Sequence, residues 1–372
     1  MSTIRKRSWV LPSGETKTAW QVDYRDQSGK RRSKQFARKK DAEAWTVTAL
    51  SEVQRGVHTA DSTSLTVTQA ANLYLDAVRG MDREPTTIAA YDQHVRLHIL
   101  PLIGGTKLSQ LTAPKVEALF DAWLRDLSRP MAVRVLRTFK AILTHAQKKG
   151  NVAQNVALAV TPPRQKRAKP KVRPPSKRLL KDILLAAAES DDLMGRAIVE
   201  LAIMSGMRAS EIRGLAWSAL DLKRGRVTVK QRADAKGVLG PPKSEAGHRV
   251  VPLPKSLIGT LRKWKLACPA HEADLVFPSK KGKTLSHGVM MRVHVDPIVA
   301  SANAATKGVH VFRHAAASLW IERGLNAKRV QRLMGHNSIQ VTFDTYGHLF
   351  DEAEKDEHLA NEIEAAIFAD AT

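Results

Sequence analysis

The feature that most constrains the fold is a basic, proline-rich segment at residues 162–178. Lysine and arginine fill most of the positions between its prolines, which are Pro162, Pro163, Pro170, Pro174 and Pro175. Prolines keep such a segment extended, and the dense positive charge holds it near phosphates. The sequence therefore predicts an extended linker between two parts of the chain. A nuclear-targeting signal is the competing interpretation of any such basic run.

The charge and size of the chain indicate a nucleic-acid partner and more than one domain. The chain has 372 residues and a formal net charge of +24 at pH 7, and this excess favours association with a polyanion. The length suits two or three domains better than one core. Because 43% of the residues are hydrophobic, we expect packed interiors and a basic charge carried by folded surfaces.

Cysteine usage and the N-terminal residues predict a cytoplasmic protein. Cys268 is the single cysteine, which excludes an intrachain disulfide and fits a reducing compartment. The first residues lead into a polar, charged stretch without the apolar run of a signal peptide or membrane span.

Residues 1–62 are predicted to form a three-stranded sheet backed by a helix. Trp20, Val22 and Tyr24 follow the alternation of a strand, and a basic partner strand follows the next turn. A β-ribbon of this kind can lie in a major groove of DNA. We predict DNA contacts from three residues of the partner strand, Arg31, Arg32 and Lys34. A solvated basic face on a small structural domain is the alternative.

Residues 63–161 are predicted to form an all-α domain. Apolar residues recur at three- and four-residue intervals in four segments, residues 66–78, 86–100, 113–127 and 131–149. Basic side chains of this domain are predicted to grip a duplex, among them Arg96, Arg134, Arg137 and Lys140. The competing interpretation is that these basic residues are ordinary solvent-exposed residues of a helical surface and do not contact DNA.

Residues 179–350 are predicted to form a mixed α/β domain, mainly α, with catalytic potential. Arg208 and Glu211 are three positions apart after an apolar helix, so the carboxylate can orient the guanidinium. Lys243 lies on or beside a predicted hairpin.

A histidine-rich helix and a downstream tyrosine complete the set of candidates. His310, Arg313 and His314 lie three and four positions apart, so one helical face presents all three. His336 follows the end of the next helix, and Tyr346 lies in a short helical segment beyond it. Two histidines four apart also fit a zinc site, but no His-Glu-x-x-His pattern occurs, so no metal is predicted.

These residue types are the parts needed to attack a phosphodiester with a phenol. A tyrosine hydroxyl has an ordinary pKa of about 10, so a histidine is expected to take its proton during attack. Guanidinium groups suit the charge that develops on the phosphate oxygens. A lysine whose pKa is lowered by nearby cations can protonate the departing 5′ oxygen. DNA strand cleavage, without a metal or nucleotide cofactor, is the leading hypothesis.

The ordered series resembles the motifs of the tyrosine recombinases, specifically the integrases of temperate phages and integrative elements. The series comprises Arg208, Lys243, His310-x-x-Arg313-His314, Gly335-His336 and Tyr346. The resemblance extends over nearly the whole chain. It implies an arm-type DNA-binding domain at 1–62, a core-binding domain at 63–161 and a catalytic domain at 179–350.

The resemblance also implies a role for each residue of the series. Tyr346 is the expected nucleophile, Arg208 and Arg313 the phosphate clamp, Lys243 the general acid, His310 the proton acceptor and His336 a further hydrogen-bond donor. Glu211 and His314 are expected to support them. The implied enzyme cleaves and rejoins DNA through a 3′-phosphotyrosyl link and integrates or excises a phage or mobile element in a bacterial host.

The implied partners are double-stranded DNA with core and arm-type sites, further copies of the chain in a homotetramer, and accessory proteins that bend DNA or set direction. The acidic tail at residues 351–372 is predicted to dock on a neighbouring protomer and to control the presentation of Tyr346. Two alternatives stay open. One is a type IB topoisomerase, which uses much the same residues, and the other is a catalytically silent, site-specific DNA-binding protein.

Overall fold

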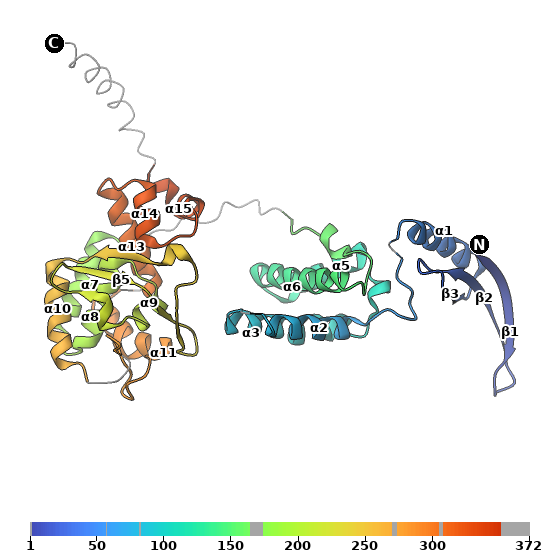
Figure 1. The fold of residues 1–372 in the computed structure, drawn as a ribbon, viewed down its shortest axis with the longest axis horizontal. Coiled ribbons are helices and arrows are strands. Elements are labelled where there is room, and N and C mark those ends of the chain that lie inside the picture. The colour runs from blue at the N-terminus through green and yellow to red at the C-terminus, as the bar shows by residue number, and fades with distance from the viewer. Residues whose placement is uncertain are drawn as a thin grey trace, which may run out of the picture. The chain divides into compact units, whose positions relative to one another are not determined.

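The structure is a computed structural model that describes residues 2–56, 58–81, 83–163, 174–269, 274–304 and 308–350. The chain divides into two compact units, Met1–Lys166 and Arg167–Thr372 (Figure 1). Residues 164–173 of the predicted linker and the acidic tail at 351–372 lie outside the described residues, so the roles predicted for them stay predictions.

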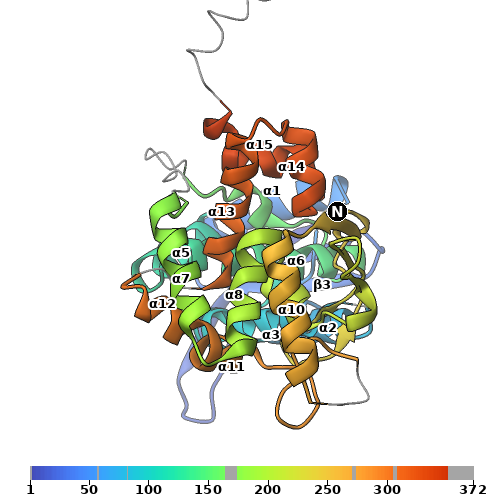
Figure 2. The same ribbon diagram turned by 90° about the vertical axis from the view of Figure 1, so that its left-hand side faces the viewer.

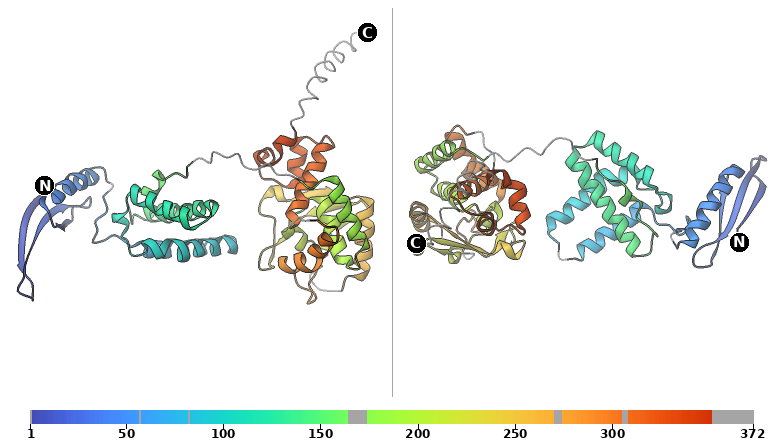
Figure 3. Two further views of the ribbon diagram at one scale, coloured as in Figure 1. Left: turned by 180° about the vertical axis from the view of Figure 1, so that it is seen from behind. Right: turned by 90° about the horizontal axis from the view of Figure 1, so that it is seen from above.

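The first unit begins with an antiparallel sheet in the order β1-β2-β3. Its elements are β1 (Thr3–Val10), β2 (Thr16–Arg25), β3 (Arg31–Phe36) and the helix α1 (Lys39–Gln54). Helix α1 packs on one face of this sheet (Figure 3). Val22 and Tyr24 are buried on β2, and the Tyr24 ring meets the Trp45 ring of α1 edge to face at 5.1 Å. The predicted sheet backed by a helix is confirmed.

The rest of the first unit is all-α, as predicted. Its helices are α2 (Val67–Arg79), α3 (Pro85–His94), α4 (Leu100–Ile103), α5 (Ala113–Asp126) and α6 (Arg129–Lys148), with short 3-10 turns at Leu108–Gln110 and Val156–Ala159. Helix α2 begins at a capping box in which Thr66 and Gln69 exchange hydrogen bonds. Trp123 of α5 and Phe139 of α6 are buried in the core that these helices enclose.

Prolines explain where helices widen in both units. The sequence predicts one helix over 86–100, whereas the structure inserts the π-helical turn η1 (Val95–Ile99) just before Pro101 of α4. The same arrangement is found at the π-helical turn η6 (Met290–Val295), which lies just before Pro297 of α12. Proline has no N–H, and its ring clashes with the carbonyl four residues earlier. A local π-turn relieves this clash without ending the helix.

The second unit combines short strands with many helices. A sheet in the order β4-β5-β8 comprises β4 (Leu220–Asp221), β5 (Arg226–Val229) and β8 (Arg249–Pro252), and a two-stranded sheet comprises β6 (Arg232–Ala233) and β7 (Leu239–Gly240). The helices are α7 (Lys177–Glu189), α8 (Leu193–Ser205), α9 (Ala209–Arg213), α10 (Lys255–Ala267), α11 (His287–Val289), α12 (Asp296–Ser301), α13 (Val309–Glu322), α14 (Ala327–Met334) and α15 (Ile339–Tyr346). Short 3-10 turns lie at Trp217–Ala219, Glu245–Gly247 and Gly347–Leu349. The predicted mixed, mainly helical fold is confirmed.

Helix α8 is the central element of the second unit. It packs against α7, α10 and α13, which surround it in Figure 2. Ala197, Ile198, Leu201 and Ala202 are fully buried along it, as expected for a helix that is apolar on every side. The helix ends at Gly206 in the left-handed conformation, with φ of 60°, and this ending sends the chain directly into Arg208.

One predicted boundary needs correction. Lys177 and Arg178 belong by sequence to the linker, but they form the first turn of α7, whose N-cap is Ser176. The Ser176 side chain accepts a hydrogen bond from the backbone of Leu179, so a serine cap starts the helix earlier than the charge pattern suggests. Among the described residues, none of the helices is long and apolar enough to cross a membrane.

Candidate active site

The candidate residues of the second unit gather where α9, α13, α14 and α15 meet. Helices α14 and α15 pack together at one end of the unit (red in Figure 1), and α13 contacts α14. Among the described residues, no group of three or more histidine, cysteine, aspartate or glutamate side chains is placed to hold a metal ion.

Arg208 is held in place from two sides. It is the N-cap residue of α9, and its backbone N–H donates to Glu211 Oε2 at 2.8 Å while its Nη1 donates to Oε1 at 2.8 Å. Its Nη2 donates to the carbonyl of Gly335 at 2.9 Å. The Arg208 side chain is still 38% exposed, so part of it faces solvent. The sequence prediction that Glu211 orients Arg208 agrees with this geometry.

Arg313 lies deeper than Arg208. It is buried on α13 and donates to the carbonyls of Gly206 and Met334. Burial, followed by the charge of Arg208, lowers the pKa of Arg313 to about 9, which leaves it cationic at neutral pH. Two guanidinium groups therefore converge on the junction of α8, α13 and α14.

Tyr346 ends α15 with its hydroxyl held by a histidine. The hydroxyl and His314 Nδ1 are hydrogen-bonded at 2.7 Å, and the His314 ring meets the His310 ring edge to face at 4.6 Å. Burial raises the pKa of Tyr346 to about 12. Burial also lowers the pKa of His314, with further contributions from His310 and Arg313. A neutral phenol thus faces a neutral imidazole that is able to accept its proton.

His336 lies beside the same tyrosine. Its Nδ1 is hydrogen-bonded to Thr342 Oγ1 at 2.9 Å, and its ring lies nearly parallel to the Tyr346 ring with centroids 6.4 Å apart. Burial, followed by the charges of Arg313 and Arg208, lowers the pKa of His336 to about 4. The Nε2 atom of a neutral imidazole held in this way through Nδ1 is free to contact a ligand.

Lys243 is an exposed candidate of the series. It lies on the segment between β7 and β8 and has no hydrogen bond or ion pair with any described residue. The same segment carries Ala246, whose carbonyl oxygen would lie 2.9 Å from a Cβ added to Gly335.

Arg249 is a residue of this site that sequence reasoning missed. Its guanidinium forms a two-pronged ion pair with Glu211, at 3.1 Å from Nη1 to Oε1 and 2.7 Å from Nη2 to Oε2. The sequence feature that could have identified Arg249 is its alternation with Val251. On β8 the two residues share the buried face. An arginine on a buried strand face requires a buried partner.

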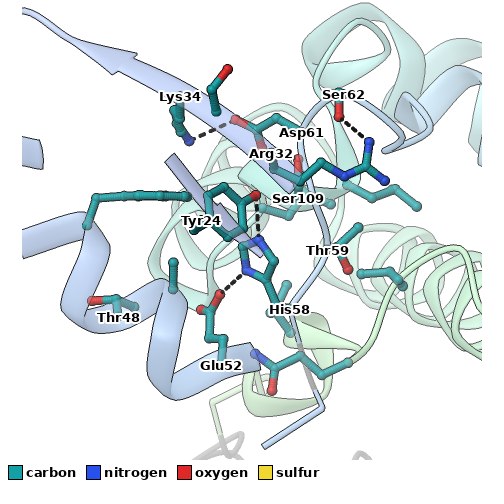
Figure 4. A pocket seen from close by; sticks show the side chains of 18 residues that line it. Tyr24, Arg32, Lys34, Thr48, Glu52, His58, Thr59, Asp61, Ser62 and Ser109 are labelled. Carbon is teal, nitrogen blue, oxygen red and sulfur yellow. Dashed lines mark hydrogen bonds and ion pairs between the residues drawn. The ribbon is translucent and has the colours of Figure 1, made fainter. Parts of the chain in front are cut away.

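The basic residues predicted on β3 do not share one face. Lys34 Nζ lies 2.7 Å from Asp61 Oδ2, and Arg32 donates to Asp26 at 2.8 Å and to Ser62 at 3.1 Å. Figure 4 shows Arg32 and Lys34 pointing toward the segment that carries Asp61 and Ser62. Arg31 is on the opposite, exposed face. Arg32 and Lys34 therefore tie the sheet to the next segment in this state.

These contacts border a cavity of about 200 Å³ in the first unit. Within it, His58 links Glu52 (3.1 Å) and Tyr24 (2.9 Å) in a chain of hydrogen bonds (Figure 4). Ser109 donates to Asp61 at 2.6 Å from the helical part of the unit. The polar groups of the cavity are largely occupied with one another.

The basic residues predicted on the helical part differ in their availability. Arg96, Arg134 and Arg137 are exposed, whereas Lys140 Nζ donates to the carbonyl of Val160 at 2.6 Å. The exposed arginines are free to meet a polyanion, and their predicted contacts with DNA stay a prediction.

Comparison with known proteins identifies the second unit. Residues 177–353 match the phage integrase family, and this range contains the whole series from Arg208 to Tyr346. The chain contains a domain of the phage integrase family. It is a site-specific recombinase by class, and the resemblance drawn from its motifs is confirmed.

The similarity of this recombinase to curated relatives extends beyond the catalytic unit. It is 25% identical over 362 residues to a tyrosine recombinase XerC-like protein of Caldanaerobacter subterraneus, which covers 87% of this chain and 90% of the relative. It is 29% identical over 228 residues to the tyrosine recombinase XerC of Xylella fastidiosa, covering 60% and 72%.

Solved structures share the fold of the recombinase. The Tn1549 transposon integrase in complex with transposon right end DNA matches with a TM-score of 0.66 and 18% identity, over 81% of this chain and 100% of that chain. A lambda integrase dimer bound to a COC′ core site matches with a TM-score of 0.59 and 19% identity, over 92% and 94%.

Proposed function

We propose that this recombinase is a DNA integrase that uses Tyr346 to cleave and rejoin DNA through a 3′-phosphotyrosyl intermediate, and that it integrates or excises a phage or another mobile element. The observation that carries the proposal is the placement of the Tyr346 hydroxyl, which is hydrogen-bonded to His314 beside His336 and next to the convergent Arg208 and Arg313.

The proposed chemistry begins with proton removal from Tyr346. Its pKa of about 12 makes the free phenolate rare at neutral pH, so a base must take the proton as the oxygen attacks phosphorus. Burial, together with the charges of Arg313 and Arg208, lowers the pKa of His310, which keeps it in the accepting form. In this proposal the proton passes to the pair of His310 and His314.

The remaining groups handle the phosphate and the leaving oxygen. Arg208 and Arg313 bind the non-bridging oxygens, where guanidinium donors fit best, and His336 Nε2 adds a hydrogen bond. As the bond from Tyr346 oxygen to phosphorus forms, the bond to the 5′ oxygen breaks, and Lys243 protonates that oxygen. The ester retains the bond energy, so a second 5′ hydroxyl can reverse the reaction without ATP.

DNA binding is expected to expose the nucleophile. Tyr346 is only 2% exposed in this state, and a buried hydroxyl cannot reach a phosphate. We therefore propose that binding shifts α15 and closes the segment of Lys243 over the same phosphate. The preceding regions, residues 1–62 and 63–161, are proposed to bind arm-type and core sites.

Assembly is proposed to be tetrameric. A lambda integrase tetramer bound to a Holliday junction shares the fold with a TM-score of 0.56 and 19% identity, which supports the proposal of four protomers acting on two duplexes. Accessory proteins that bend the DNA are proposed to set the direction of the reaction.

Strand transfer between two duplexes tests this function. Duplexes tiled across the DNA that flanks the gene would be mixed with the full-length protein in the absence of ATP. We expect a recombinant product whose strands come from two different duplexes. Relaxation of supercoiled DNA with no exchange would favour a topoisomerase instead, and sequence-specific binding with no cleavage would favour a silent DNA-binding protein.

A further inference from the structure

Three arginines hold three consecutive carbonyls at the C-terminal end of α14. Arg249 Nε donates to Leu333 at 2.7 Å, Arg313 donates to Met334, and Arg208 Nη2 donates to Gly335 at 2.9 Å. The last carbonyls of a helix have no partner within it and lie at the negative end of its dipole. Cationic donors therefore find a strong fixed anchor here, directly before His336.

Of these three arginines, Arg249 is the one whose three guanidinium nitrogens all donate within the protein, although Arg313 is about equally buried. The Arg249 side chain is 1% exposed, against 38% for Arg208. Each of its three guanidinium nitrogens donates within the protein, to Leu333, Gly247 or Glu211. Any part that Arg249 plays in the reaction must therefore act through another residue.

That other residue is Arg208, reached through Glu211. The Glu211 carboxylate accepts four hydrogen bonds, two from Arg249 and two from Arg208, and its side chain is 2% exposed. Each oxygen is shared between the two arginines, so the position of the carboxylate fixes the position of the Arg208 guanidinium. A carboxylate shared in this way leaves the exposed edge of Arg208 for a phosphate.

We propose that Arg249 is a positioning residue for strand cleavage, which holds Glu211 so that Arg208 presents its exposed edge to the scissile phosphate. The inference rests on the proposed function. Without Arg249, the buried carboxylate would have Arg208 as its one cationic partner and would draw the guanidinium inward. Small displacements of a phosphate-binding group are enough to slow a reaction about a hundredfold.

Variants of the pair separate positioning from simple stability. Arg249→Lys keeps the positive charge but loses the guanidinium group that contacts both oxygens of Glu211. Arg249→Met loses the charge and the guanidinium group. The double variant Glu211→Gln/Arg249→Met removes the negative and the positive charge of the pair together. Arg213→Lys is the matched control, because Arg213 is also buried and donates to the carbonyl of Leu285 at 2.5 Å, away from Glu211.

The readout is single-turnover cleavage of a nicked duplex that wild type cleaves, at saturating protein, with DNA affinity and circular dichroism measured in parallel. We expect Arg249→Lys to stay folded and to bind DNA as wild type does, but to cleave about ten- to a hundredfold more slowly. The double variant should cleave faster than Arg249→Met, and Arg213→Lys should cleave at the wild-type rate.

Two outcomes would overturn the inference while wild type still cleaves. One is a wild-type cleavage rate in Arg249→Lys, and the other is a double variant no faster than Arg249→Met. An equal loss in Arg213→Lys would also count against it, since any buried arginine would then matter alike. Absence of cleavage by wild type on every duplex that it binds specifically would instead overturn the proposed function, and this inference with it.

Discussion

At the residue scale, protonation states decide what the site can do. Tyr346 has a raised pKa, and the histidines around it have lowered pKa values, each mainly because of burial. The site is therefore a set of neutral groups surrounded by cations. This arrangement favours an arriving phosphate and disfavours any further proton.

His336 gives the first prediction, an acid-dependent loss of stability. Its pKa is about 4 in the folded protein against 6.5 ordinarily, so its contribution is fully present above pH 6.5 and is lost as the pH falls toward 4. His336 alone should lower the free energy of unfolding by about 2 kcal/mol between pH 7 and pH 5.

Urea unfolding of wild type and His336→Asn at the two pH values measures this contribution. The variant should lose less stability on acidification, because asparagine does not titrate. An equal loss in both proteins would show that His336 is not kept neutral by the fold.

Part of the site could be predicted from single residues and their spacing. The pairing of Arg208 with Glu211 follows from a separation of three positions, and the adjacency of His310 and His314 follows from four. The second partner of Glu211, Arg249, could not be predicted from spacing, because it lies 38 positions away on another element. Local spacing reports helical neighbours, whereas contacts between elements depend on tertiary packing.

At the element scale, the end of α14 joins the parts of the site. Gly335 there has φ of 63°, and a Cβ added to it would lie 2.9 Å from both the Ala246 carbonyl oxygen and Arg249 Nη1. The left-handed turn and the close approach of Arg249 both require the absence of a side chain.

Gly335→Ala is therefore expected to lower the free energy of unfolding by at least about 2 kcal/mol, since the left-handed conformation alone costs an alanine roughly 1–2 kcal/mol. It should also slow cleavage by displacing Arg249. Gly324→Ala is the control, because Gly324 also has a positive φ, of 79°, but has nothing within 4 Å of an added Cβ. Both stabilities would be measured by thermal unfolding. An equal loss of stability in the two variants would show that the close approach of Arg249 to Gly335 does not matter.

Most elements could be predicted from periodicity and caps, and the exceptions have local causes. Helix α14 begins after the cap Asn326 and ends at Gly335, and asparagine and glycine are typical of these two positions. The π-turn before Pro101 was missed because hydrophobic periodicity cannot distinguish a widened turn from a regular one. The early start of α7 was missed because Lys177 and Arg178 were assigned to the basic linker by their charge, and the Ser176 cap before them was not considered.

At the scale of the whole molecule, the charge of +24 predicts DNA binding that weakens steeply with salt. Each phosphate contact contributes to the slope of log affinity against log salt concentration. The inward-facing Arg32 and the exposed Arg137 make different predictions, because Arg32 is already paired with Asp26.

We expect Arg137→Ala to reduce the slope by about 1 without a change in stability. Arg32→Ala should leave the slope unchanged and destabilise the first unit instead. Fluorescence anisotropy over a salt series, with thermal unfolding alongside, measures both quantities. A reduced slope in Arg32→Ala would mean that Arg32 leaves Asp26 to contact DNA.

The most direct test of the whole account is the covalent bond to Tyr346. Full-length protein would be incubated with nicked duplexes tiled across the DNA that flanks the gene, and any adduct that resists denaturation would be mapped by peptide sequencing. We expect an adduct on Tyr346 in wild type, and we expect a Tyr346→Phe variant to bind the same duplex with unchanged affinity and to form none. An adduct that persists in Tyr346→Phe, or a wild type that binds its site and never forms one, would contradict the account.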